Sequence, residues 1–191
     1  MREKKCPWLW LFRLFESMGI ALVLALLVLS FVSPTAKVVG PSMRETLQDG
    51  DLLLTLRPWI AGEISRGDVV VVREESFSAK PIIKRVIATE GQTVEIDFET
   101  GLVTVDGMIL NETYIRGRTT RDEGTVFPYT VPAGELFLLG DNRDDSADSR
   151  DSRLGAVGED KLVGRAVFLL FPGVNASDNQ RDFHRIGCIN K

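Results

Sequence analysis

The sequence predicts a mainly β protein that follows one N-terminal membrane-spanning helix, and three observations support this prediction. Residues 17–36 contain no charged side chain. From Gly40 onward, short runs rich in Val, Leu and Ile alternate with turns that contain Gly and Asp. No long segment after residue 40 has the 3.6-residue periodicity of an amphipathic helix. Of the 191 residues, about 150 follow the apolar segment, enough for one domain with a buried core.

Residues 17–36 form the expected membrane anchor and consist mostly of Leu, Val, Ala and Ile. At about 1.5 Å per residue, such a helix matches a hydrocarbon core of about 30 Å. Residues 1–16 carry four Lys and Arg side chains against two glutamates. This basic excess predicts a cytoplasmic N-terminus, with residues 37–191 on the other side of the membrane. A cleaved signal peptide is the alternative, which the long apolar run and the poor cleavage site at residues 34–36 disfavour.

Nine segments after the anchor have the length and composition of β-strands. They are Asp51–Leu56, Asp68–Arg73, Ile82–Ala88, Thr93–Phe98, Leu102–Val105, Met108–Leu110, Phe127–Val131, Glu135–Leu139 and Gly164–Phe171. The segments at 93–98 and 102–105 alternate in polarity around a Glu-Thr-Gly turn, which predicts a β-hairpin. We therefore expect one β-rich body, from which residues 93–126 form a small hairpin-bearing excursion.

The composition argues against several classes of function. The net charge is −4, so no basic excess exists to bind a nucleic acid backbone. Two cysteines and one histidine are too few for a Cys/His zinc site, and neither a metal nor an organic cofactor is expected. A Ser-His-Asp triad could use only His184, close to the C-terminus. A catalytic serine in this chain is therefore expected to use a base other than histidine.

The turn that follows the anchor contains the first candidate catalytic group, Ser42. Gly40 allows a close approach of the backbone, and Pro41 stiffens the turn. Exposed backbone N–H groups in such a turn can stabilise an oxyanion. The alternative is an ordinary turn between the anchor and the first strand.

The strand at 82–88 contains the second candidate, Lys84. Alternate side chains of a strand share a face, so Lys84 and its neighbour Arg85 point in opposite directions. If one face is packed, one of these cations is removed from water, and desolvation lowers the pKa of a lysine. A lysine with a pKa of about 8 is roughly one-tenth neutral at pH 7 and can accept a proton from a serine hydroxyl. The alternative is a solvated lysine on an edge strand.

The segment 140–150 contains the third candidate group, in the run Asp-Ser-Ala-Asp-Ser-Arg. Asp148 and Arg150 can form a charge-assisted pair that fixes the loop, and Ser146 can then direct its hydroxyl toward a neutral lysine. A solvated loop and a calcium-binding loop are the alternatives. The spacing of the aspartates does not follow the EF-hand pattern, and no glutamate closes it.

Taken together and in this order, the segments resemble the bacterial type I signal peptidases over essentially the whole chain. The resemblance implies the antiparallel β-sheet fold that this family shares with self-cleaving repressors. It also implies a Ser/Lys dyad, with Ser42 as nucleophile and Lys84 as general base. Ser146 matches the serine that orients this lysine, and Asp148 and Arg150 match a supporting pair. At Gly40, where some members carry a hydroxyl residue, only backbone donors remain for an oxyanion, with the Ser42 N–H as first choice.

The resemblance further implies the activity, substrate and location of the protein. It predicts a single-pass protease of the bacterial inner (plasma) membrane that removes signal peptides from exported preproteins through an acyl-enzyme. Its partners are then preproteins, bound as an added β-strand and cut after a small-x-small sequence, and membrane lipid. The residues expected to line the small apolar pockets are Val38, Met43, Leu47, Ile82 and Ile83.

Two residues depart from the family pattern. Glu45 occupies a position where members usually have proline, and Asp145 occupies one where asparagine is common. A carboxylate close to Lys84 favours the charged amine and works against catalysis. Two other functions therefore stay open: a specialised Ser/Lys maturation peptidase, and a membrane-tethered β-domain that binds exported proteins without cutting them.

Overall fold

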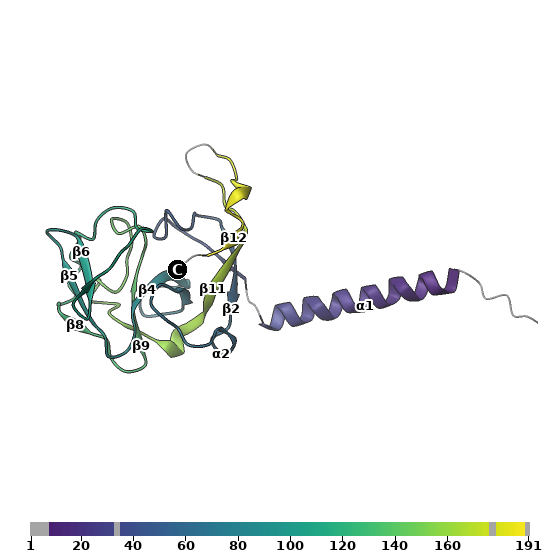
Figure 1. The fold of residues 1–191 in the computed structure, drawn as a ribbon, viewed down its shortest axis with the longest axis horizontal. Coiled ribbons are helices and arrows are strands. Elements are labelled where there is room, and N and C mark those ends of the chain that lie inside the picture. Colours follow the sequence, from purple (N-terminus) through teal and green to yellow (C-terminus); the bar gives the residue numbers. More distant parts are fainter. Residues whose placement is uncertain (1–7, 33–34, 176–178, 190–191) are drawn as a thin grey trace, which may run out of the picture.

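The computed structural model describes residues 8–32, 35–175 and 179–189. One long helix, α1 (Trp8–Val32), extends away from a β-rich body (Figure 1). Its segment Trp10–Leu27 has a mean hydropathy of 1.8 and is not buried against the rest of the protein, so it has the length and composition of a membrane span. The helix begins before the expected anchor at residue 17 and ends before residue 36. The last two residues of the expected anchor belong instead to the short strand β1 (Thr35–Lys37).

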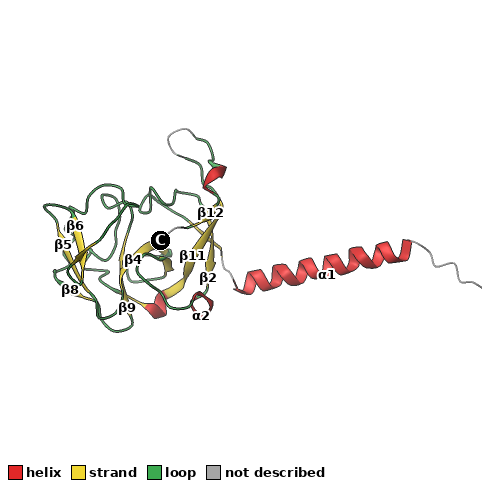
Figure 2. Cartoon of the chain, in the orientation of Figure 1, coloured by secondary structure: helices red, strands yellow, loops and turns green. Residues whose placement is uncertain are grey.

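The main sheet is antiparallel and contains most of the strands (yellow in Figure 2). In spatial order they are β1, β2 (Leu52–Leu56), β11 (Leu162–Phe171), β3 (Val69–Val72), β4 (Ile82–Ala88), β9 (Glu135–Leu139) and β10 (Val157–Gly158), with β12 (Gly187–Cys188) paired to β11. β4 lies between β3 and β9, and all its residues except Ile82 are buried. The candidate Lys84 therefore belongs to an interior strand and not to an edge.

A second, smaller sheet lies at the end of the body opposite α1 (Figure 1). Its order is β7 (Met108–Ile109), β6 (Leu102–Val105), β5 (Thr93–Asp97) and β8 (Tyr129–Thr130). Val94 and Val103 of this sheet pack in one cluster with Phe137 of β9. The excursion expected at 93–126 thus shares a hydrophobic core with the main body, and its sheet continues to Thr130.

The mainly β fold class predicted from the sequence is confirmed, and β4, β6 and β9 have the predicted bounds. The pattern missed the short strands β1, β10 and β12. It also missed the one-turn helix α2 (Pro58–Ala61), which begins with a proline, and the 3₁₀ turns η1 (Glu159–Lys161) and η2 (Phe183–Arg185). Elements of two to four residues are too short to show a periodicity in the sequence. The three missed strands are defined by their pairing with strands that are distant in the sequence.

Candidate active site

Ser42 and Lys84 line the same open pocket, which has a volume of about 450 Å³. Ser42 lies on the turn that follows β1, and Lys84 lies on β4. The other lining residues come from the Ser42 turn, the β3–β4 loop, β4 and the loop after β9; they are Val39, Pro41, Phe77, Ser78, Ile82, Asp145, Ala147 and Arg153. The fold therefore brings the two residues of the expected dyad together, although 42 positions separate them in the sequence (84 − 42).

The turn that carries Ser42 is held from several sides. Gly40 has a φ of +91°, which L-residues with a side chain rarely adopt, and its N–H donates to Asp49 Oδ1 at 2.8 Å. The Arg44 N–H donates to the Pro41 carbonyl oxygen at 3.0 Å. Within the described residues, the Ser42 N–H donates no hydrogen bond. Of the two residues expected to serve an oxyanion, Ser42 thus has an available amide, whereas the Gly40 amide is already engaged.

The side chain of Lys84 is almost completely buried, with 3% of its surface exposed. Burial lowers its pKa to about 8, against the opposing effect of the Asp148 carboxylate. Among the described residues, no side chain forms a hydrogen bond or ion pair with its amine. A buried, unpaired amine is the form of lysine that can act as a base near neutral pH.

Arg85, on the other face of β4, is also buried, but its charge is neutralised. Its Nε and Nη2 donate to the two carboxylate oxygens of Asp141 at 2.8 and 2.7 Å, and its guanidinium lies 4.0 Å from the centre of the Tyr114 ring. Both faces of the strand are therefore packed. Only Lys84 is left without a partner of opposite charge in contact with it.

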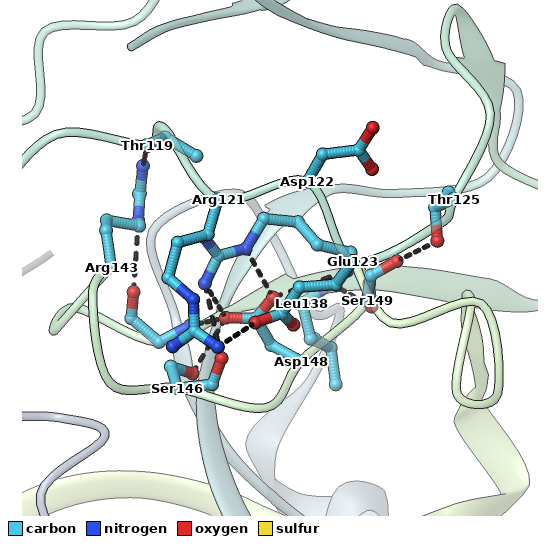
Figure 3. A network of polar contacts seen from close by, with 12 residues as sticks. Thr119, Arg121, Asp122, Glu123, Thr125, Leu138, Arg143, Ser146, Asp148 and Ser149 are labelled. Carbon is cyan, nitrogen blue, oxygen red and sulfur yellow. Dashed lines mark hydrogen bonds and ion pairs between the residues drawn. The ribbon is translucent and has the colours of Figure 1, made fainter. Parts of the chain in front are cut away.

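Asp148 is the centre of a buried polar network in the loop after β9 (Figure 3). Its carboxylate accepts hydrogen bonds from Arg150 Nε at 2.8 Å, from Arg150 Nη2 at 2.9 Å and from the Gly140 N–H at 2.9 Å. Burial raises the pKa of Asp148, but the hydrogen bond and charge of Arg150 outweigh it, so the pKa lies below its usual value. The Ser146 hydroxyl donates to the same carboxylate at 2.7 Å. This bond leaves the lone pairs of Ser146 Oγ free to accept.

Gly140 allows this loop to close on the Ser42 turn. A Cβ atom at this position would lie 2.1 Å from Ser146 Oγ and 2.6 Å from the Ser42 carbonyl oxygen. Next to it, Asn142 donates from its backbone to the Ser42 carbonyl oxygen and from its side chain to Pro41. The sequence placed both residues in the candidate segment 140–150, directly after the apolar strand β9, but it assigned a role to neither.

The excursion covers the outer side of the same loop. Arg143 donates to the buried Thr119 hydroxyl at 2.6 Å and forms an ion pair with Glu112. Further along, the Thr125 hydroxyl donates to the Ser149 carbonyl oxygen at 2.9 Å. The loop with Ser146 and Asp148 is therefore held between the Ser42 turn and the excursion. The sequence did not indicate this second contact.

Residues 11–171 match the family model described as signal peptidase, peptidase S26. The chain belongs to this family. It is 36% identical to signal peptidase I T of Bacillus subtilis over 82% of this chain and 83% of that protein. It is 34% identical to a signal peptidase I of Bacillus amyloliquefaciens over 90% of this chain and 89% of that protein. A crystal structure of a signal peptidase I from Enterococcus faecalis matches with a TM-score of 0.42 and 28% identity, over 55% of this chain and 97% of that one.

Family membership identifies the chain as a serine endopeptidase that removes signal peptides, so the alternative of a non-catalytic binding domain no longer holds. Among the described residues, no three His, Cys, Asp or Glu side chains converge on a possible metal position.

The residues predicted to form the substrate pockets of the signal peptidase are placed differently from one another. Ile82 is half-buried and lines the pocket with Ser42 and Lys84. The other four lie in a buried core cluster below the turn; they are Val38, Met43, Leu47 and Ile83. The exposed Val39 lines the pocket instead of its neighbour Val38. Adjacent residues point in opposite directions along an extended segment, and the sequence does not reveal which of the two faces the core.

The two departures from the family pattern do not place a charge against the amine of Lys84. Glu45 has a φ of +87°, and its exposed carboxylate lies 3.6 Å from Arg116. Asp145 lines the pocket but is exposed. It is not among the groups that shift the Lys84 pKa, which are Asp148, Arg150, Asp141 and Glu123.

Proposed function

We propose that this signal peptidase cuts exported preproteins with a Ser/Lys dyad in which Ser42 is the nucleophile and Lys84 the general base. The observation that carries the proposal is the position of an unpaired, buried amine with a pKa of about 8 in the pocket that contains the Ser42 side chain. In this family, a serine hydroxyl must be activated by a base, and the single histidine, His184, lies in η2 and does not line this pocket.

The neutral amine of Lys84 accepts the proton of the Ser42 hydroxyl as Oγ attacks the scissile carbonyl carbon. The free N–H of Ser42 stabilises the oxyanion. When the tetrahedral intermediate collapses, the Lys84 ammonium donates its proton to the leaving amine, and the acyl group stays on Ser42. In the second half, the amine of Lys84 takes a proton from water, whose oxygen attacks the ester, and then returns this proton to Ser42 Oγ.

Ser146, Asp148 and Arg150 support this dyad in the proposal. Because the Ser146 proton is directed to Asp148, the Ser146 oxygen can accept a hydrogen bond from the Lys84 amine and orient it. The Asp148–Arg150 pair is buried and holds Ser146 in place. Ala147 and Ile82 line the pocket beside Ser42 and are candidates to select small side chains before the cut.

We also propose the arrangement of the chain in the membrane. Residues 1–16 lie on the cytoplasmic side, the anchor of residues 17–36, most of which belongs to helix α1, crosses the bacterial plasma membrane, and residues 37–191 form the catalytic domain outside. The basic N-terminus supports this orientation. Since Ser42 follows the end of α1 closely, the dyad lies near the membrane surface, where the end of a signal peptide emerges.

The test is cleavage of a preprotein by the full chain in detergent. The Ser42→Ala and Lys84→Ala variants are each expected to lose at least about 10³-fold in kcat/KM. Ser76→Ala and Lys80→Ala are matched controls, since both residues are exposed on the β3–β4 loop and neither lines the pocket, and both variants are expected to keep wild-type activity. Efficient cleavage by Lys84→Ala would contradict the assignment of the base. Cleavage only of one specialised substrate would favour a maturation peptidase.

A further inference from the structure

Beside the proposed dyad, one buried atom of a glutamate and one of an arginine lack a hydrogen-bond partner in the described part of the chain. Among the described residues, three buried side-chain nitrogen or oxygen atoms have none: Thr104 Oγ1, Glu123 Oε2 and Arg150 Nη1. Leaving a buried polar atom unpaired costs about 1–3 kcal/mol, and more when the group is charged. The other carboxylate oxygen of Glu123, Oε1, forms an ion pair with Arg121 Nη2 at 3.3 Å. A charged donor and a carboxyl oxygen that are both buried and unpaired in one network indicate one water that bonds to both.

The backbone holds Glu123 next to Arg150. The Thr125 N–H donates to the Arg150 carbonyl oxygen at 3.0 Å, and the Ser152 N–H donates to the Glu123 carbonyl oxygen at 3.2 Å. Between these bonds, Gly124 and Asp151 form an antiparallel bridge. The segment with Glu123 therefore runs as a short strand along the end of the catalytic loop. Figure 3 shows Glu123 in the same polar cluster as Asp148 and Ser146.

The guanidinium of Arg150 directs two of its nitrogens toward Asp148 and leaves the third, Nη1, without a partner among the described residues. Its Nε and Nη2 bind the Asp148 carboxylate, and Nη2 also reaches the Ser146 carbonyl oxygen at 3.3 Å. Nη1 is the remaining end of the fork. A guanidinium is planar and rigid, so a partner at Nη1 also fixes the orientation of the two donors that hold Asp148.

We propose that Glu123 is a positioning residue of the active site, whose carboxylate binds Arg150 Nη1 through one water and thereby fixes Asp148, Ser146 and Lys84. This inference rests on the proposed Ser/Lys dyad. It gives the excursion a role in catalysis, because Glu123 belongs to the excursion, whereas Asp148, Ser146 and Arg150 belong to the loop after β9 and Lys84 belongs to β4.

The inference has an electrostatic consequence for Lys84. The charged groups that act on Lys84 are Asp148, Arg150, Asp141 and Glu123, and those that act on Glu123 are Arg150, Asp148, Arg121 and Asp151. The negative charge of Glu123 favours the ammonium form of Lys84. It also offsets the charge of Arg150, which disfavours that form. Removing the charge of Glu123 therefore lets the neutral amine appear at lower pH.

The experiment compares Glu123→Gln with Asp122→Asn in the full chain in detergent. Asp122 is the neighbouring exposed acid, and asparagine keeps the acceptor for the Gly124 N–H. Glu123→Gln is expected to lower kcat about tenfold with KM within about twofold, because the loss is in positioning. It is also expected to move the pH of half-maximal kcat/KM down by about half a unit. Glu123→Asp, which keeps the charge, is expected to keep the wild-type midpoint, and Asp122→Asn to match the wild type in all three quantities.

The inference is overturned if Glu123→Gln has the kcat and the pH midpoint of the wild type. It is also overturned if a thermal melt shows that the loss of kcat is fully explained by a smaller fraction of folded protein. If Glu123→Gln does not fold, the kcat of Glu123→Asp decides, since its shorter side chain is expected to lower kcat if the contact positions Arg150. Activity that survives Lys84→Ala refutes the dyad itself. With that variant inactive, an unchanged Glu123→Gln profile refutes only the role of Glu123.

Discussion

Asn142 donates two hydrogen bonds to the turn that carries Ser42, from a position 100 residues further along the chain (142 − 42). Its backbone N–H binds the Ser42 carbonyl oxygen at 2.9 Å, and its side-chain Nδ2 binds the Pro41 carbonyl oxygen at 3.1 Å. The loop that carries Ser146 and Asp148 thus also contacts the turn of the proposed nucleophile. Residues 140–150 therefore contribute to the placement of Ser42.

The first prediction concerns the side chain of Asn142. Asn142→Ala removes the bond to Pro41 but keeps the backbone bond to Ser42, so the turn is expected to loosen without detaching. We expect kcat to fall about tenfold, since small displacements of a nucleophile have large effects on rate. Stability is expected to fall by about 1 kcal/mol, the usual value for one hydrogen bond. Preprotein cleavage measures the change in kcat, and urea unfolding measures the change in stability. Asn111→Ala, at an exposed asparagine, is the control. An equal kcat for the two variants contradicts the prediction.

The second prediction concerns the close contact at Gly140. Its φ is not in the left-handed region, so alanine is disfavoured there only by the 2.1 and 2.6 Å approaches to Ser146 Oγ and the Ser42 carbonyl oxygen. Gly140→Ala is expected to separate the loop from the turn and to lower kcat/KM at least about 100-fold. Gly187→Ala is the matched control, since no atom lies within 4 Å of a Cβ at that position. Retention of activity by Gly140→Ala shows that the two segments are not in contact during catalysis.

The third prediction concerns the pH dependence of cleavage. In the proposed dyad the neutral amine of Lys84 is the active form, and its pKa is about 8. The value of kcat/KM for the wild type is therefore expected to rise with pH, with half of its maximum near pH 8, and to stay high above it. A pH–rate profile with one preprotein substrate measures this. A rise centred near pH 6 or 10 indicates another base.

The fourth prediction concerns the effect of Lys84 on stability. Burial lowers the pKa of Lys84 in the folded state from 10.5, the ordinary value for a lysine, to about 8. The unfolded state therefore binds more protons between these values, and the stability contribution of this residue increases as the pH rises from about 8 to about 10.5. At pH 7 the buried ammonium costs on the order of 3 kcal/mol. Lys84→Met is expected to be inactive but more stable than the wild type at pH 7, by an amount that shrinks at pH 10; a less stable variant at pH 7 contradicts this.

The fifth prediction concerns Glu45, which has a φ of +87°. Glycine adopts this conformation without strain, so Glu45→Gly is expected to raise stability by about 0.5–1 kcal/mol. Proline has a φ of about −65°, so Glu45→Pro is expected to destabilise the turn by about 3 kcal/mol and to lower activity, although proline is usual here in the proteins that this sequence resembles. Thermal unfolding of the three proteins ranks them. A Glu45→Pro variant as stable as the wild type indicates a different backbone at this position.

Some features of the protein were readable from local sequence. The apolar segment near the N-terminus, the Val-rich strand β3, the Ile-rich strand β4 and the strand β9 stand out by composition and length alone. Ser42 and Lys84 were found because motifs occur in a characteristic order along the chain. Each strand and each motif is contained within a short run of consecutive residues, so the alternation of polarity, the turn residues and the charges in that run predict it directly.

The tertiary structure decided which of these groups can act. Lys84 and Arg85 are adjacent cationic residues, and the sequence does not show which of them is paired. In the structure Arg85 binds Asp141, which lies 56 residues away in the sequence, and Lys84 has no such partner within the described residues. The two hydrogen bonds from Asn142 to the Ser42 turn, and the position of Glu123 beside Arg150, likewise join residues that are distant along the chain. The pKa of a buried amine depends on every charge that packing brings near it, and no local pattern contains that information. The sequence by itself thus determined which residues are candidates, and three-dimensional packing decided their protonation, orientation and support.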